Sequence, residues 1–174
     1  PGRRLLLARD RMGQKPLYWA ATERVVAFAS EAKALAAVEG LDRAIDLESL
    51  DLYLQLGYVP SPRTIWRGIR KLEPGHRIVI ALDSAESALA AQPQSWWTPP
   101  AAEAADNDAP DDVLDERARA VGEAMTEAVR IRLEADVPLG FFLSGGLDSS
   151  AVLALARKAM PTGRLRTFSM AFPD

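Results

Sequence analysis

A short polar loop late in the chain has the residue types needed to bind phosphate. It reads Ser144-Gly145-Gly146-Leu147-Asp148-Ser149-Ser150. Because glycine lacks a Cβ, the backbone here can approach a ligand closely and turn its N–H groups inward as an anion nest. The serine hydroxyls can add donors, and a helix starting near Asp148 would point the positive end of its dipole at the same place. The loop therefore predicts a phosphate site.

Asp148 indicates that a cation belongs to this site. A carboxylate beside phosphates is repulsive unless a cation lies between them, and Mg²⁺ commonly takes one or two carboxylates together with phosphate oxygens. Asp148 is therefore the predicted metal ligand. The loop does not end in a lysine and lacks the G-x-x-x-x-G-K-[ST] spacing, so it is not a Walker A loop.

Other interpretations of the same residues are weaker. Ser-Gly-Gly can be a flexible turn and Asp148-Ser149-Ser150 an ordinary helix cap, but the strand and helix predicted around them favour a binding loop. A serine-hydrolase elbow is excluded because Phe142 occupies the first glycine position of G-x-S-x-G. The only histidine, His76, is distant in sequence and is predicted to be a polar turn residue.

The elements around the loop predict an α/β unit. The continuous apolar run 139–143 is typical of a strand buried on both faces of a parallel sheet. A helix is predicted over 148–160 and a second strand over 165–172, so the order is a βαβ unit, which is right-handed as a rule. Before them, apolar residues at spacings of three and four predict a helix from Asp111 to about Arg132, ended by Pro138.

The first half of the chain has shorter elements. Apolar runs at 5–8, 17–20 and 25–29, separated by turn-prone residues, predict an antiparallel meander. Helices are predicted over 31–38, with Ser30 as its cap, and over 46–56, capped by Asp46 and stopped by Gly57. An ordered loop over 58–74 and a strand over 77–82 follow. We interpret the run Arg9-Asp10-Arg11 as ion pairs that shape a loop.

Composition narrows the function classes. The chain has 174 residues, a net charge of −3 and no cysteine, which excludes disulfides and thiolate metal sites within it. No basic stripe indicates nucleic acid, and no apolar segment is long enough to span a membrane. Residues 85–110 are rich in Ala and Pro and predict a linker, although Trp96-Trp97 indicates that part of it packs onto a domain. A cytoplasmic protein is expected.

Five blocks of the sequence resemble, in the right order, segments of the glutamine-hydrolysing asparagine synthetases. Residues 136–150 resemble the pyrophosphate loop region of that family, a loop of the ATP-pyrophosphatase (PP-loop) type. The other blocks are 8–18 and 28–35, similar to its glutaminase domain, 72–76 with Trp97, similar to the domain junction, and 167–170, similar to the strand after the loop helix. Together they are spread along nearly the whole chain, from residue 8 to residue 170.

The resemblance implies a fold of two domains, α+β followed by α/β. Residues 1–84 would be the C-terminal part of a glutaminase domain of the N-terminal-nucleophile type, a partial αββα sandwich. Residues 85–110 would be a linker. Residues 111–174 would be the N-terminal part of a synthetase domain, with the first βαβ of a parallel-sheet PP-loop fold. The chain is then an internal piece of a longer protein.

The resemblance also implies a reaction. In the family, glutamine is hydrolysed at an N-terminal cysteine and the ammonia passes through an internal channel to the second domain. There ATP and Mg²⁺ convert aspartate to β-aspartyl-AMP, and ammonia displaces AMP to give asparagine. The implied contacts are Leu143 and Met170 at the adenosine, and Ser144, Gly145, Gly146, Asp148, Ser149 and Ser150 at the pyrophosphate. No catalytic residue of the glutaminase is expected here, since the nucleophile would precede Pro1.

Three alternatives stay open at this point. A relative could activate another carboxylate, as in β-lactam ring closure or sugar and peptide amidation. Other PP-loop ligases, such as NAD or GMP synthetases and tRNA thiolases, are disfavoured by the glutaminase-like blocks. A non-catalytic paralogue is disfavoured by the intact loop. The expected partners are the small molecules ATP, glutamine and aspartate or another carboxylate, with no nucleic acid and no membrane, and a homodimer is compatible with the sequence.

Overall fold

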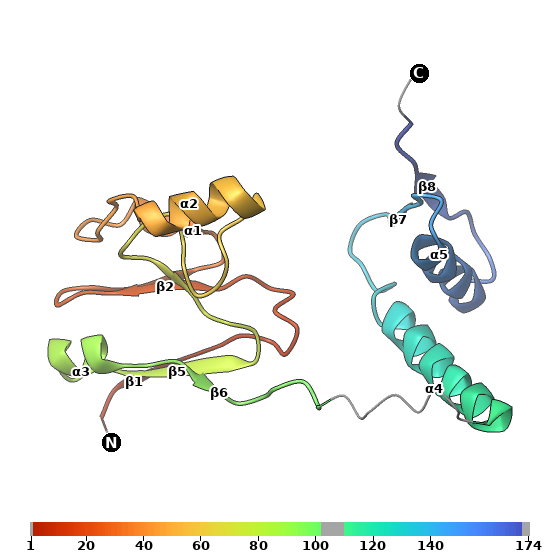
Figure 1. Cartoon of the computed structure of the whole chain (residues 1–174), viewed down its shortest axis with the longest axis horizontal. Coiled ribbons are helices and arrows are strands. Elements are labelled where there is room, and N and C mark those ends of the chain that lie inside the picture. The colour runs from red at the N-terminus through yellow and green to blue at the C-terminus, as the bar shows by residue number, and fades with distance from the viewer. Residues whose placement is uncertain (1, 102–109, 172–174) are drawn as a thin grey trace. The chain divides into compact units, whose positions relative to one another are not determined.

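The computed structural model describes residues 2–101 and 110–171. The chain divides into two compact units, the first ending at Ala101 and the second starting at Ala102, and each is described by itself (Figure 1). Within the described residues, no helix combines the length and the apolar character needed to cross a membrane.

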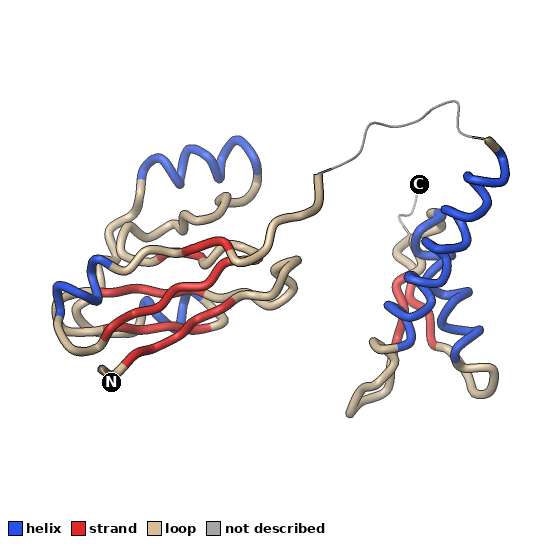
Figure 2. The backbone as a smooth tube through the Cα atoms, turned by 90° about the horizontal axis from the view of Figure 1, so that it is seen from below, coloured by secondary structure: helices blue, strands red, loops and turns tan. Residues whose placement is uncertain are grey.

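The first unit contains two three-stranded antiparallel sheets. Its elements are β1 (Arg4–Ala8), β2 (Tyr18–Ala21), β3 (Val26–Ala29), α1 (Ala32–Ala36), α2 (Leu47–Leu56), β4 (Arg70–Lys71), β5 (His76–Ala81), α3 (Ala85–Ala90) and β6 (Gln94–Ser95). One sheet has the order β1-β5-β6 and the other β3-β2-β4. Figure 1 shows β2 in one layer and β1, β5 and β6 in another, and Figure 2 shows the strands of the unit in red, seen from below.

Side chains from both sheets form one apolar cluster between them. In β5, Ile78 and Ile80 are fully buried while Val79 between them is 45% exposed, which is the alternation expected of a strand with one buried face. Leu7 from β1 and Trp19 from β2 belong to the same cluster. The two sheets therefore pack face to face.

The two helices α1 and α2 lie on the other side of the β3-β2-β4 sheet (Figure 1). A second cluster forms there from Ala20, Leu35, Leu41 and Ile69. The predicted helix ends are confirmed for α2: its N-cap is Asp46, and Gly57 ends it with a φ of 77°, a left-handed conformation that glycine adopts readily. The first unit is therefore a mixed α/β unit with the layer order helices, sheet, sheet.

Some local predictions for this unit were wrong. The three first strands do not form a meander: β2 and β3 form a hairpin, whereas β1 pairs with β5, about 70 residues away in sequence. Periodicity identifies strands but does not specify partners. The helix α1 starts at Ala32, and its N-cap is Glu31 rather than Ser30.

Part of the segment predicted as linker is folded onto the first unit. The helix α3 contacts β5, and its Ala88 is buried in the cluster between the sheets. The strand β6 pairs with the start of β5. The backbone N–H groups of Trp96 and Trp97 both donate to the carbonyl of Gly75. The adjacent tryptophans therefore mark a packed stretch, as predicted, while residues 102–109 lie outside the described residues.

The second unit contains one parallel strand pair and two helices. Its elements are α4 (Asp111–Arg130), β7 (Gly140–Phe142), α5 (Leu147–Ala159) and β8 (Arg166–Phe168). The strands β7 and β8 pair in parallel, with Phe141 opposite Thr167, and α5 connects them. The predicted strand-helix-strand order is confirmed. The expectation that residues 139–143 are buried on both faces was wrong, since Phe142 is 88% exposed.

Candidate functional site

The polar loop connects the end of β7 to the start of α5. Gly145 has a φ of +84°, which is costly for any residue with a Cβ, although a Cβ there would meet no atom within 4 Å. Gly146, the N-cap of α5, has an extended backbone with φ −80° and ψ 165°. A Cβ on Gly146 would lie 3.5 Å from Ser144 Oγ, an ordinary contact. The protein itself therefore requires glycine at 145 but not at 146.

The first backbone N–H groups of α5 converge on this loop. The N–H of Ser150 donates to the carbonyl of Gly146 at 3.2 Å and so begins the helical hydrogen-bond ladder. The N–H groups of Leu147, Asp148 and Ser149 precede that ladder and stay available to an acceptor outside the helix. Together with the positive end of the helix dipole, they form an anion-binding arrangement.

The serine hydroxyls are used differently from the sequence prediction. Ser149 Oγ and Ser150 Oγ donate to the carbonyl of Gly146 at 3.1 and 2.8 Å, and Ser144 Oγ lies 3.1 Å from Ser149 Oγ. Because each hydroxyl has one proton, Ser149 and Ser150 present lone pairs rather than donors to the outside. They would have to rotate about χ1 to donate to a phosphate.

Asp148 lies in the first turn of α5 with an exposed side chain. Across residues 2–101 and 110–171, its carboxylate has no ion pair and no hydrogen bond. The same residues hold no cluster of three or more His, Asp or Glu side chains that could bind a metal by themselves. A hard cation such as Mg²⁺ fits this carboxylate only if ligand oxygens and waters complete its shell, which is the way Mg²⁺ usually binds beside phosphates.

The remaining two predicted contacts, Leu143 and Met170, lie at the same edge of the parallel strand pair. Leu143 directly follows β7, and Met170 is two residues beyond β8, so both follow the carboxyl ends of parallel strands, where open α/β sheets bind ligands. Met170 is 82% exposed. The structure therefore brings the predicted residues to one edge of one sheet.

Ser169 positions this edge, and sequence reasoning did not identify it. Its hydroxyl donates to the carbonyl of Leu143 at 2.7 Å, while the Leu143 N–H donates to the carbonyl of Phe168 at 2.9 Å. These bonds extend the β7–β8 pairing up to the first residue of the loop. Nothing in the sequence pattern distinguishes this serine from a surface serine.

In the first unit, Arg9 and Asp10 shape the loop between β1 and β2, as predicted, but by hydrogen bonds to the backbone. The Arg9 guanidinium donates to the carbonyls of Lys15, Leu72 and Gly13 at 3.0, 2.7 and 2.9 Å. The Asp10 carboxylate accepts the N–H groups of Lys15 and Gln14, and these bonds hold the pKa of Asp10 below its usual value. The predicted ion pairs are absent from the described residues.

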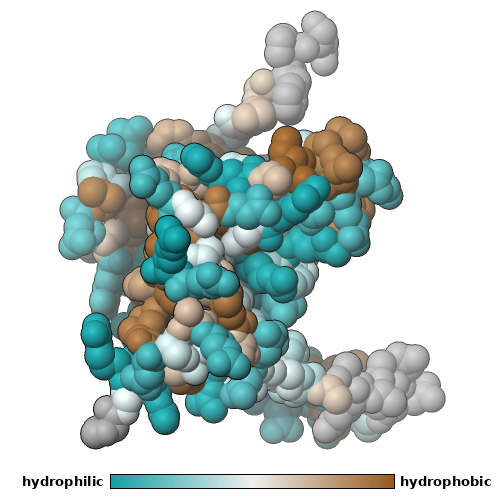
Figure 3. All heavy atoms as spheres, turned by 90° about the vertical axis from the view of Figure 1, so that its left-hand side faces the viewer, coloured by the Kyte–Doolittle hydropathy of each residue, from teal (hydrophilic) through white to brown (hydrophobic). Residues whose placement is uncertain are grey.

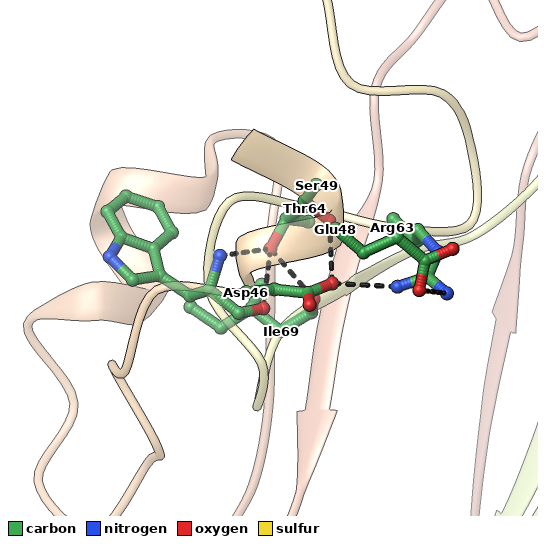
Figure 4. A network of polar contacts seen from close by, with 7 residues as sticks. Asp46, Glu48, Ser49, Arg63, Thr64 and Ile69 are labelled. Carbon is green, nitrogen blue, oxygen red and sulfur yellow. Dashed lines mark hydrogen bonds and ion pairs between the residues drawn. The ribbon is translucent and has the colours of Figure 1, made fainter. Parts of the chain in front are cut away.

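A second polar network joins α2 to the loop that follows it (Figure 4). Asp46 accepts the hydroxyl of Ser49 and an Arg63 N–H, both at 2.7 Å, and Arg63 also pairs with Glu48 at 2.6 Å. The Ser49 hydrogen bond first, and Arg63 after it, lower the pKa of Asp46. Thr64 Oγ1, buried beside this network, donates to the carbonyl of Ile69 at 2.8 Å. The network therefore fixes the start of α2.

Two family models match the chain, one in each half. Residues 2–97 match the glutamine amidotransferase domain, and residues 120–174 match asparagine synthase. The first match covers more than half of the chain and includes α3 and β6.

Curated relatives match along nearly the whole chain. It is 34% identical over 97% of its length to a Methanocaldococcus jannaschii protein provisionally named asparagine synthetase [glutamine-hydrolyzing] 2, covering 31% of that protein. It is 34% identical to asparagine synthetase [glutamine-hydrolyzing] 1 of Bacillus subtilis, over 95% of the chain and 24% of the relative. A match of 32% identity, over 91% of the chain and 22% of the relative, is to the amidase chry2 of Gibberella zeae. The chain thus spans 22% to 31% of the length of these relatives.

Proposed function

Because this chain belongs to the family of glutamine-hydrolysing asparagine synthetases, we propose that it is part of an enzyme that makes an amide with ATP and with ammonia from glutamine. The carboxylate we propose is that of aspartate, and the product asparagine. Within that enzyme, the proposed role of the residues of this chain is to bind ATP and Mg²⁺.

We assign the two halves of the chain to two domains of that enzyme. Residues 1–84 are the C-terminal part of a glutaminase domain with an αββα sandwich, residues 85–110 connect the domains, and 111–174 begin the synthetase domain. The two packed antiparallel sheets and the parallel β7–β8 pair support this assignment. Its boundary lies within residues 85–110, of which 85–101 pack onto the first unit.

The loop between β7 and α5 is the proposed pyrophosphate site. The N–H groups of Leu147, Asp148 and Ser149 receive the β- and γ-phosphates, and the missing Cβ of Gly146 leaves room for them. Asp148 holds Mg²⁺, which offsets the phosphate charge. Leu143 and Met170 lie beside the adenosine, and Ser144, Gly145 and Ser150 complete the loop.

Within this site the reaction is a transfer of the adenylyl group. A carboxylate oxygen of aspartate attacks the α-phosphorus, the bond from that phosphorus to the bridging oxygen breaks, and pyrophosphate leaves. Ammonia then attacks the carbonyl carbon of β-aspartyl-AMP, and AMP departs after a proton is lost. The helix N-terminus stabilises the charge that develops on the leaving pyrophosphate. No glutaminase nucleophile is assigned within these residues, since the chain has no cysteine.

One observation carries the proposal: three backbone N–H groups outside the helical ladder lie after a parallel strand together with a carboxylate that has no partner among residues 2–101 and 110–171. Exchange of radiolabelled pyrophosphate into ATP by the full-length protein tests it. Exchange that requires both Mg²⁺ and aspartate is expected. Exchange that requires a different carboxylate would favour a related amidotransferase, as the similarity to an amidase allows, and no exchange with any carboxylate would refute catalysis.

A further inference from the structure

A pocket of about 540 Å³ lies under α2 in the first unit, well away from the polar loop in sequence. Its lining comes from β2, α1, α2, β4 and the loop after α2, namely Tyr18, Ala32, Leu50, Tyr53, Gly57, Tyr58, Val59, Thr64, Ile65, Trp66 and Lys71. Its volume and its mostly apolar, aromatic lining are typical of small-molecule sites in proteins.

The positions of the lining residues follow from the fold. Tyr18 and Lys71 are register partners on β2 and β4, so their side chains leave the sheet on the same face, the one covered by the helices. Leu50 and Tyr53 are three residues apart on α2 and so share one face of that helix. Figure 3 shows further hydrophobic surface toward the top of the view, on the side of the unit where α1 and α2 lie.

Lys71 is the only charged residue in this lining, and it has no acidic partner within the described part of the chain. Its ammonium donates to the carbonyl of Val59, a neutral acceptor. Burial lowers the pKa of Lys71, and the positive charge of Arg9 lowers it further. A partly desolvated ammonium without an acidic partner is stabilised when an anion approaches it.

We propose that this pocket binds a small carboxylate with an aromatic or branched apolar body and without an amine. The carboxylate pairs with the Lys71 ammonium, and the body lies against Tyr18, Tyr53 and Trp66. Free amino acids fit poorly, because their own ammonium group would be repelled by the Lys71 ammonium and would lose water in a mostly apolar pocket. The proposed occupant is therefore chemically different from glutamine, aspartate and ATP.

Binding of three matched probes to the full chain tests this inference, by ligand-observed NMR and isothermal titration calorimetry. The probes are phenylacetate, its neutral amide phenylacetamide, and phenylalanine, which adds an amine. Phenylacetate is expected to bind saturably and about tenfold or more tightly than the other two, since a charge-assisted hydrogen bond is roughly twice as strong as a neutral one.

Three variants test whether the Lys71 ammonium is the group that binds the carboxylate. Lys71→Met keeps the length of the side chain and is expected to weaken phenylacetate binding about tenfold, to the level of the amide. Lys71→Arg retains most of the affinity, and Lys33→Met, at a lysine whose side chain is 82% exposed, leaves it unchanged. Far-UV circular dichroism verifies that each variant is folded. Equal binding of acid and amide, unchanged binding by Lys71→Met, or no binding of any probe, as when an apolar protein segment fills the pocket, would each overturn the proposal.

Discussion

Gly145 and Gly146 are adjacent, yet replacing each by alanine should damage different properties. Gly145 has a φ of +84° and open space around it, whereas Gly146 has an extended φ of −80° and an ordinary contact with Ser144 Oγ. Gly145→Ala should therefore affect stability through backbone conformation. Gly146→Ala should be tolerated by the fold and should affect only a ligand that approaches the backbone.

The magnitudes follow from this geometry. Holding an alanine in a left-handed conformation costs about 1–2 kcal/mol, so Gly145→Ala should lower the free energy of unfolding of the second unit by that amount. Gly146→Ala should change stability by under about 1 kcal/mol, because restriction of the unfolded chain and the poorer N-cap preference of alanine oppose each other. If its methyl displaces phosphate from one N–H, the loss of a hydrogen bond to a charged group, about 1.5–3 kcal/mol, lowers the exchange rate about tenfold to a hundredfold.

Two measurements on the full-length protein separate these effects: denaturant unfolding, and ATP–pyrophosphate exchange at subsaturating ATP. Gly163→Ala is the matched control, since Gly163 also has a positive φ, of 90°, and nothing within 4 Å of its absent Cβ, but lies in the turn after α5. Gly163→Ala should lower the free energy of unfolding about as much as Gly145→Ala does. It should leave the rate of ATP–pyrophosphate exchange per folded molecule unchanged. Normal exchange by Gly146→Ala would refute the assignment of this loop to pyrophosphate.

Three further substitutions test the rest of the structure. Asp148→Asn should change the free energy of unfolding by under about 1 kcal/mol, because the side chain is exposed, has no partner within the described residues and acts on α5 only through the helix dipole. The Mg²⁺ concentration for half-maximal exchange should rise about tenfold or more, and unchanged Mg²⁺ dependence would exclude Asp148 as the ligand. Arg9→Ala should lower the free energy of unfolding by about 1–3 kcal/mol, since it removes one exposed and two part-buried hydrogen bonds to backbone carbonyls; an effect under 1 kcal/mol in urea titration would contradict this. The lowered pKa of Asp46 stabilises the fold above its unfolded value of 3.8, and this contribution is lost as pH falls through the lower folded pKa. Acid titration of Asp46→Asn should therefore show a shallower loss of stability below about pH 4 than the parent, and identical slopes would show that the Ser49 and Arg63 contacts are energetically neutral.

The sequence predicted those elements whose signals are local. Gly57 ends α2 as expected, because the left-handed conformation that ends a helix depends on the type of a single residue. The strand, loop and helix around Ser144–Ser150 were likewise found from neighbouring residues, and the parallel pairing of β7 and β8 confirmed their order. The roles of the individual loop residues in binding ATP and Mg²⁺ stay predictions.

Features that depend on distant partners could not be predicted. β1 pairs with β5 rather than with the next strand, and only the complete set of strands and their packing decides between the two. The Arg9 guanidinium reaches the carbonyl of Leu72, 63 residues away, so the motif identified a loop but not its bonds. The hydroxyls of Ser149 and Ser150 donate to the nearby carbonyl of Gly146, and the residue types alone do not distinguish such a local bond from a bond to a phosphate.

Buried side chains are distributed unevenly between the two units, and this has a consequence for folding cooperativity. The first unit has two apolar clusters, whereas among residues 110–171 only Val129 and Ala156 are buried. Heating should therefore melt this chain in two steps, the second unit first, and amide hydrogen exchange should be slow in β5 and fast in β7. The loop proposed to bind ATP lies in the second unit, which melts first. A nucleotide that binds there would therefore raise the temperature of the first transition and leave that of the second transition unchanged.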